Sequence, residues 1–139
     1  MKIGRQVGSP GAAEKDQCPA HGKSVMQKPI QAKFDNHYTW GEVCDGWHLL
    51  RSAGLSVIEE RMPAGSAEQR HFHLQARQFF YVLDGELTME IDGLTQAIGP
   101  YQGVEIPPGR PHQALNRSNT AVRFLVISQP PGQEDRLPA

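Results

Sequence analysis

The chain has 139 residues, with 14 basic residues balanced by 15 acidic ones and a formal net charge of −1. This length suffices for one domain with its own core, and the even charge leaves no basic patch for a nucleic acid or an anionic membrane. No apolar run approaches the ~20 residues of a membrane-spanning helix. We therefore expect neither a nucleic-acid partner nor a membrane partner.

Residues 1–29 are rich in Gly, Pro, Ala, Lys and Gln and have no apolar periodicity, which predicts a flexible, irregular N-terminal extension. Residues 130–139 (PPGQEDRLPA) are interpreted as a Pro-rich C-terminal tail. Between them, residues 30–129 contain short runs of Val, Ile, Leu, Phe, Tyr and Thr separated by turn signals, with no convincing helix. This pattern predicts one all-β domain, a sandwich or a barrel.

The two cysteines, Cys18 and Cys44, do not indicate a disulfide framework, because Cys18 lies in the irregular extension. The first 29 residues also lack the apolar core of a secretory signal. Two free thiols and a cytoplasmic location are therefore expected.

The first clear strand register comes from Asp84-Gly85, which is typical of a two-residue hairpin turn. Such a hairpin pairs Val82 with Leu87 and Gln78 with Ile91. The returning segment ELTMEID alternates apolar and polar residues, so its apolar side is the inner face. Gln78 is then predicted to point into an apolar interior, where its amide needs a partner.

Three histidines are candidates for a metal site. His71 and His73 are two positions apart, so on a strand their side chains leave the same face about 6–7 Å apart and both can reach one ion. His112 follows a Pro-Pro-Gly turn and can bring a third imidazole from a distant strand. The other three histidines, His21, His37 and His48, are interpreted as hydrogen-bonded or surface groups.

These residues belong to two longer motifs through which the sequence resembles a small single-domain cupin. The first motif comprises Gly65, His71, His73, Gln78 in place of the usual glutamate, and Gly85; the second comprises Gly99, Pro107, Gly109, His112 and Asn116. Two multi-residue patterns in the right order are a specific signal. The resemblance spans residues 47–127 and implies a cupin jelly-roll β-barrel, commonly a homodimer.

The resemblance also implies a metal set of His71, His73, Gln78 and His112 around one divalent transition-metal ion. Imidazole and amide ligands accept zinc, nickel, manganese, iron and cobalt alike, so the sequence does not identify the ion. An amide in place of a carboxylate leaves the ion's charge uncompensated, which favours a strong Lewis acid and disfavours a higher oxidation state. Asn116 is interpreted as a structural amide.

The sequence therefore favours a metal-dependent cupin that acts on a small oxygen-rich molecule, such as a sugar or sugar acid, by Lewis-acid isomerisation, tautomerisation or ring opening. A similar His, His, Gln and His set occurs in cupins that linearise unsaturated uronates, and this analogy rests on the ligands alone. The alternatives are a non-catalytic small-molecule sensor and a cupin dioxygenase. Tyr101, Glu105 and Arg110 flank the second motif and are candidate catalytic proton-transfer groups.

Overall fold

The structure is a computed structural model that describes residues 26–132 and 135–139. Most of the predicted N-terminal extension, including Cys18, lies outside these residues. In the described part, the only helical element is a 3₁₀ turn, Phe34–Asn36, and no helix is long and apolar enough to cross a membrane. Cys44 is a buried free thiol.

The described residues form strands that are short and follow one another closely. In chain order they are β1 (His37–Trp40), β2 (Cys44–Arg51), β3 (Ser56–Met62), β4 (His71–His73), β5 (Arg77–Asp84), β6 (Leu87–Ile91), β7 (Leu94–Ile98), β8 (Gly103–Ile106), β9 (His112–Leu115), β10 (Val122–Gln129) and β11 (Arg136–Pro138). The pairings between these strands of the described residues are all antiparallel.

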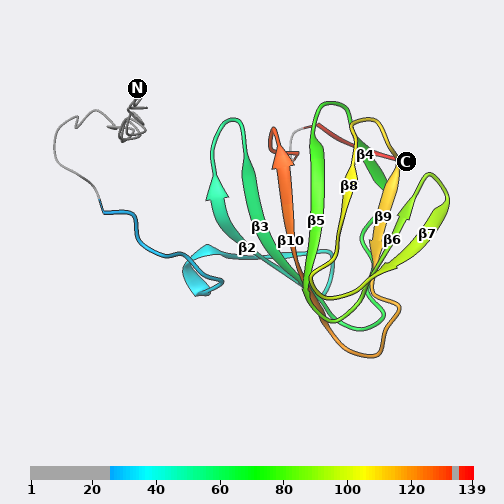
Figure 1. Cartoon of the computed structure of the whole chain (residues 1–139), viewed down its shortest axis with the longest axis horizontal. Coiled ribbons are helices and arrows are strands. Elements are labelled where there is room, and N and C mark those ends of the chain that lie inside the picture. The colour runs from blue at the N-terminus through cyan, green and yellow to red at the C-terminus, as the bar shows by residue number, and fades with distance from the viewer. Residues whose placement is uncertain (1–25, 133–134) are drawn as a thin grey trace, which may run out of the picture.

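The strands make two sheets that face one another, as the jelly-roll prediction requires. One has the order β1-β2-β3-β10-β5-β8 and the other β11-β4-β9-β6-β7. Figure 1 shows the first sheet as a curved layer, with β6, β7 and β9 in the second. The core between them is apolar and almost fully buried, and includes Met62, Val82, Leu87, Met89 and Phe124. The all-β prediction is confirmed.

The hairpin register predicted at Asp84-Gly85 is wrong, because β5 and β6 lie in different sheets. Gln78 on β5 pairs with Ser128 on β10 and Ile106 on β8, and not with Ile91. The turn carries the chain from one sheet to the other, so the apolar faces of β5 and β6 oppose each other. Gln78 still points inward and is 7% exposed, because the alternation of sides along a strand does not depend on which strand is its neighbour.

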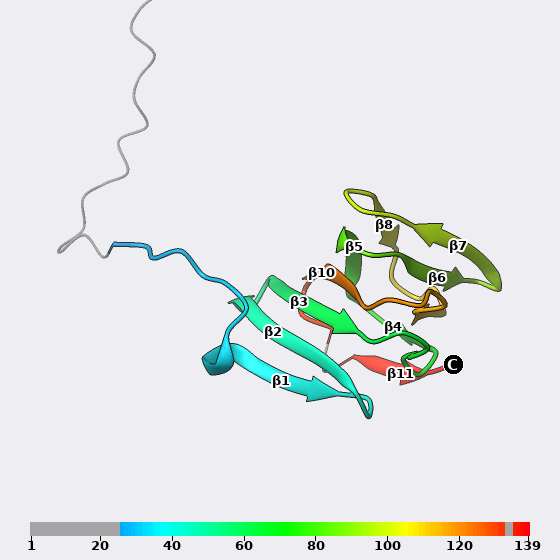
Figure 2. The ribbon, with the colours of Figure 1, turned by 90° about the horizontal axis from the view of Figure 1, so that it is seen from below.

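The C-terminal tail differs from the free Pro-rich arm expected from its composition. Arg136–Pro138 forms strand β11 at the edge of the second sheet and pairs with β4, so that Arg136 faces His73. Figure 2 shows β11 beside β4, while β1, β2 and β3 run side by side in the other sheet. The edge of β4 supplies the hydrogen-bonding partners that so short and polar a segment needs to become a strand.

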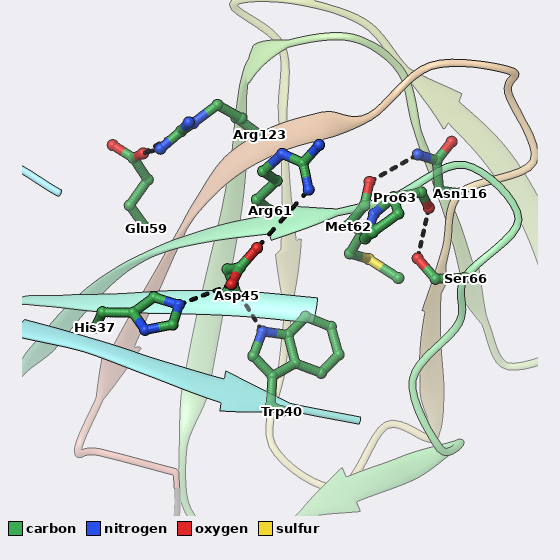
Figure 3. A network of polar contacts seen from close by, with 10 residues as sticks. All are labelled: His37, Trp40, Asp45, Glu59, Arg61, Met62, Pro63, Ser66, Asn116 and Arg123. Carbon is green, nitrogen blue, oxygen red and sulfur yellow. Dashed lines mark hydrogen bonds and ion pairs between the residues drawn. The ribbon is translucent and has the colours of Figure 1, made fainter. Parts of the chain in front are cut away.

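Asn116 is the structural amide that the sequence suggested. It is 1% exposed, and its Nδ2 donates to the carbonyl oxygens of Met62 (2.9 Å) and Thr120 (2.8 Å). Its Oδ1 accepts from the backbone N–H of Ser118. Figure 3 shows the bond to Met62. The amide therefore satisfies backbone groups on both of its polar atoms.

The turn at Gly85 should tolerate no side chain. Its φ is +83°, and a Cβ there would stand 2.6 Å from the carbonyl oxygen of Ala121. Gly93 has a similar φ of +87° but open space around it. We expect Gly93→Ala to lower the free energy of unfolding by about 1 kcal/mol through the backbone conformation alone, and Gly85→Ala by about 3 kcal/mol. Urea unfolding measures both free energies. Equal losses in the two variants would contradict a clash between the new Cβ at position 85 and the Ala121 carbonyl oxygen.

Candidate metal centre

The structure brings the three predicted histidines together in the second sheet. His71 and His73 lie on β4, and His71 pairs directly with His112 on β9. All three side chains are buried, at 4%, 5% and 0% exposure. Each offers a nitrogen that lies within 4.8 Å of those of the other two. These three histidines could therefore hold one metal ion.

One side of each imidazole is fixed by an acceptor of the protein. The Nδ1 atoms approach the Gln69 carbonyl oxygen for His71 (2.8 Å), Asp135 Oδ1 for His73 (2.9 Å) and the Arg110 carbonyl oxygen for His112 (2.9 Å). Carbonyl and carboxylate oxygens only accept, so each neutral ring carries its proton on Nδ1. The lone pair is left on Nε2, the usual arrangement for a metal-binding histidine.

The atoms left without a partner converge on the same place. His73 Nε2, His112 Nε2 and Gln78 Oε1 are three of the four buried side-chain polar atoms that lack a hydrogen bond in the described structure. Gln78 donates its Nε2 to Ser128 Oγ at 3.0 Å, so the amide orientation leaves the oxygen free. Each unsatisfied buried acceptor costs about 1–3 kcal/mol. A cation is the group that satisfies acceptors of this kind together, so the residues fit a metal ion.

The electrostatics of the cluster favour the neutral forms of His71 and His112. Burial lowers the pKa of His71 to about 3, and the positive charge of Arg136 adds to this effect. Burial also lowers the pKa of His112. Because neither ring takes up a proton near neutral pH, the Nε2 lone pairs stay available to a cation.

Asp135, which the sequence reasoning missed, holds His73 in place. Its Oδ1 accepts from His73, and its Oδ2 accepts the backbone N–H groups of Gln75 (2.7 Å) and Ala76 (3.0 Å). Burial opposes ionisation of Asp135, but these hydrogen bonds outweigh it and lower its pKa. Gly132 packs so closely that a Cβ would lie 2.8 Å from His73 Cε1. No sequence signal links Asp135 to a histidine 62 positions earlier.

A cavity of about 160 Å³ opens beside His71, His73 and Gln78. Its polar wall also includes Tyr38, Glu60, Glu68 and Arg136, none of which was predicted. Glu60 had a usable signal, since the alternation along β3 puts it on the inner face. The others come from a neighbouring edge strand, a loop and the tail, whose positions depend on the closed fold.

The structure places the three candidate proton-transfer groups away from this cavity. Tyr101 lies in the turn between β7 and β8 and is 76% exposed. Glu105 is exposed and lies near Arg77 (3.9 Å), because β8 turns Ile106 inward and Glu105 outward. Arg110 points to Asp92 (2.7 Å), and only its carbonyl oxygen serves the site. None of the three lines the cavity.

A two-sheet jelly-roll barrel with a buried cluster of three histidines defines the cupin class of protein. The family profile Cupin_2 (Cupin domain) matches residues 58–128, just over half of the chain. The chain belongs to this family.

Individual relatives are distant. An oxidoreductase of Arthrobotrys oligospora is 28% identical over 88 residues, which is 60% of this chain and 34% of that protein. The chain spans 34% and 47% of the lengths of two curated relatives that it matches.

Solved structures share the fold. KdgF from Halomonas sp. superposes with a TM-score of 0.66 and 15% identity, over 70% of this chain and 88% of that one. A sugar phosphate isomerase of the cupin superfamily from Silicibacter pomeroyi superposes with a TM-score of 0.57 and 24% identity, over 62% of this chain and 59% of that one. At these identities the likeness extends to the fold alone.

Asp135→Asn should weaken metal binding by about 10–100-fold, since an amide cannot accept from His73 and from the two backbone N–H groups through both of its terminal atoms. Titration with Zn²⁺ against a competing chelator measures the change. Asp45→Asn is the matched control. Asp45 also hydrogen-bonds a histidine, with 2.7 Å between its Oδ1 and His37 Nε2, but it does not line the cavity (Figure 3). An equal loss in both variants would show that Asp135 acts only on general stability.

Proposed function

We propose that this protein is a metal-dependent enzyme that acts on a small oxygen-rich molecule, of the sugar or sugar-acid class, by isomerisation, tautomerisation or ring opening. The observation that carries the proposal is the set of unpartnered acceptors, His73 Nε2, His112 Nε2 and Gln78 Oε1, beside a cavity. A structural core would satisfy such atoms internally. We include Gln78 as the fourth ligand.

The proposed ligand set is electrically neutral. Three imidazoles and one amide leave the full charge of a divalent ion uncompensated, and such an ion supplies Lewis-acid polarisation of carbonyl and hydroxyl oxygens. This chemistry moves protons and needs no change in oxidation state. It therefore suits tautomerisation better than oxygen activation.

The residues that line the cavity favour the binding of an anionic substrate. Trp40, Ile58 and Phe80 supply an apolar lining that excludes water, and Arg136 places a positive charge on the same cavity. That charge reaches the interior, since it lowers the pKa values of His71 and Glu60. A guanidinium at the opening can pair with the carboxylate of a uronate or with a phosphate.

A dioxygenase is the second candidate, favoured by the three histidines and by the oxidoreductase among the curated relatives. It predicts oxygen uptake when the protein is loaded with iron(II) and a substrate is present. A non-catalytic sensor predicts thermal stabilisation by a sugar acid without turnover. Either result, in the absence of isomerisation, would overturn the leading proposal.

The leading proposal predicts that the metal-loaded protein converts a 4,5-unsaturated uronate to its keto form. Carried out in D₂O, the reaction should place deuterium on the carbon that becomes protonated, which proton NMR detects. Removal of the ion with a chelator should abolish conversion, and adding the ion back should restore it. A chelator-treated protein that converts the uronate at the original rate would contradict a metal-dependent reaction.

Gln78→Glu tests the fourth ligand. A carboxylate adds a negative charge beside the cation, so the variant should hold Zn²⁺ at least about tenfold more tightly and polarise the substrate less. Metal retention during dialysis and the rate of uronate conversion measure the two effects. Gln96→Glu, the same change on the exposed strand β7, should alter neither. Unchanged retention in Gln78→Glu would exclude Gln78 as a ligand.

A further inference from the structure

A tyrosine and a glutamate meet across three strands in the wall of the cavity. Tyr38 on β1 pairs with Gly46 on β2, and Gly46 pairs with Glu60 on β3. The Tyr38 ring lies over Gly46, where a Cβ would stand only 2.3 Å from Tyr38 Cζ and 2.6 Å from its hydroxyl oxygen. The missing side chain at Gly46 thus lets the Tyr38 hydroxyl reach across β2 toward the Glu60 carboxyl group, near enough for a hydrogen bond that acts on the pKa values of both groups.

Both residues are held in the cavity and not merely near it. Glu60 follows Ser56 and Ile58 along the inner face of β3, and all of them line the cavity that contains His71 and His73. The Tyr38 ring is stacked on His48, with 4.6 Å between the ring centroids and 30° between the planes. A carboxyl group between Ile58 and Met62 on the inner face of β3 is costly to bury, and a position of this kind is more often filled by Ile or Val.

The surroundings of Glu60 favour its protonated form. Burial, and after it the charge of Glu68 in the loop before β4, raise the pKa of Glu60 to about 8, against the opposing influence of Arg136 on β11 and of the Tyr38 hydrogen bond. The neighbouring strands β2 and β10 place only Gly46 and Phe124 beside it in register. A divalent ion in the cavity lowers this pKa from its metal-free value toward neutrality.

We propose that Glu60 is the general acid of this site, that Tyr38 is its positioning residue, and that the substrate is an enol whose carbon receives the proton. The inference rests on the proposed function and names the residue that donates the proton which this function requires. Tyr38 holds the carboxyl group in the wall of the cavity that His71, His73 and Gln78 also line.

The step is balanced without any co-reactant. The O–H bond of Glu60 breaks as the electron pair of the enol C=C bond forms a new C–H bond. A lone pair of the enol oxygen becomes the second bond of the carbonyl group, and the proton of the enol hydroxyl passes to the Glu60 carboxylate. The net change is an isomerisation from enol to ketone, and Glu60 returns to its starting state. In an unsaturated uronate this enol forms when the ring opens: the bond between the anomeric carbon and the ring oxygen breaks, the anomeric hydroxyl becomes the aldehyde, and its proton passes to the former ring oxygen.

The test compares Glu60→Gln, Tyr38→Phe and Glu59→Gln in the full-length, metal-loaded protein. Glu59 is the adjacent residue on β3 but lies on the outer face, where its carboxylate pairs with Arg123. Zn²⁺ titration below the pKa of Glu60, where its carboxyl group is uncharged, should give nearly the same affinity for all three variants and wild type, which separates this role from metal binding. The thermal midpoint of each variant checks that it is folded.

The decisive measurement is conversion of the unsaturated uronate in D₂O as a function of pH. In wild type, kcat should fall at high pH as Glu60 loses its proton; this fall is the high-pH limb of the profile. Glu60→Gln should lower kcat by about 10²–10⁴-fold and lose the high-pH limb. Tyr38→Phe should lower kcat less and move that limb to higher pH, because the Tyr38 hydrogen bond lowers the pKa of Glu60. Glu59→Gln should match wild type. In metal-free protein, carbon-13 NMR should show a glutamate carboxyl carbon that titrates near pH 8 and is absent from Glu60→Gln.

The two proposals fail in different ways. If wild type converts the uronate and Glu60→Gln does so at the same rate with the same pH profile, Glu60 is not the acid and the proposed function stands. If metal-loaded wild type converts no uronate, the proposed function fails and this inference fails with it. If Tyr38→Phe lowers the rate but leaves the high-pH limb in place, Tyr38 does not position Glu60.

Discussion

The fixed direction of three imidazole rings is the constraint on which the rest of the molecule depends. Each Nδ1 donates to an oxygen of the protein, so the Nε2 lone pair of each ring must face the interior. Two of these nitrogens and the Gln78 oxygen find no partner among residues 26–132 and 135–139. The closed barrel shields them from water, so their burial costs folding energy that a bound cation would offset.

The site exists only in the closed fold because its parts come from both sheets. The histidines lie on β4 and β9 of one sheet, whereas Gln78 and Glu60 lie on β5 and β3 of the other. Asp135 connects the C-terminal tail to the site, because its carboxylate accepts hydrogen bonds from the His73 ring and from the loop that follows β4. Metal affinity and the packing of the tail should therefore be coupled.

Local periodicity predicted the direction of side chains well, whereas the pairing of strands required long-range information. The two-residue spacing of His71 and His73 and the inward direction of Gln78 follow from alternation along single strands, and the structure confirms the spacing and the direction. The Asp84-Gly85 hairpin was wrong because a turn sequence does not specify whether the next strand stays in the same sheet. Asp135 was missed for a related reason, since a polar tail becomes a strand only through the exposed edge of β4.

The proposed neutral ligand set and the carboxyl group in the opposite wall complement each other. A carboxylate ligand would cancel part of the ion's charge, whereas Gln78, as the proposed fourth ligand, would leave that charge free to act on the substrate and on Glu60. Burial and Glu68 raise the pKa of Glu60, while Arg136, Tyr38 and a bound cation lower it. Opposing effects of this kind bring a carboxyl group close to neutral pH, where a general acid both holds its proton and releases it readily. The proposal thus assigns the amide at position 78 to the proton chemistry as well as to the metal.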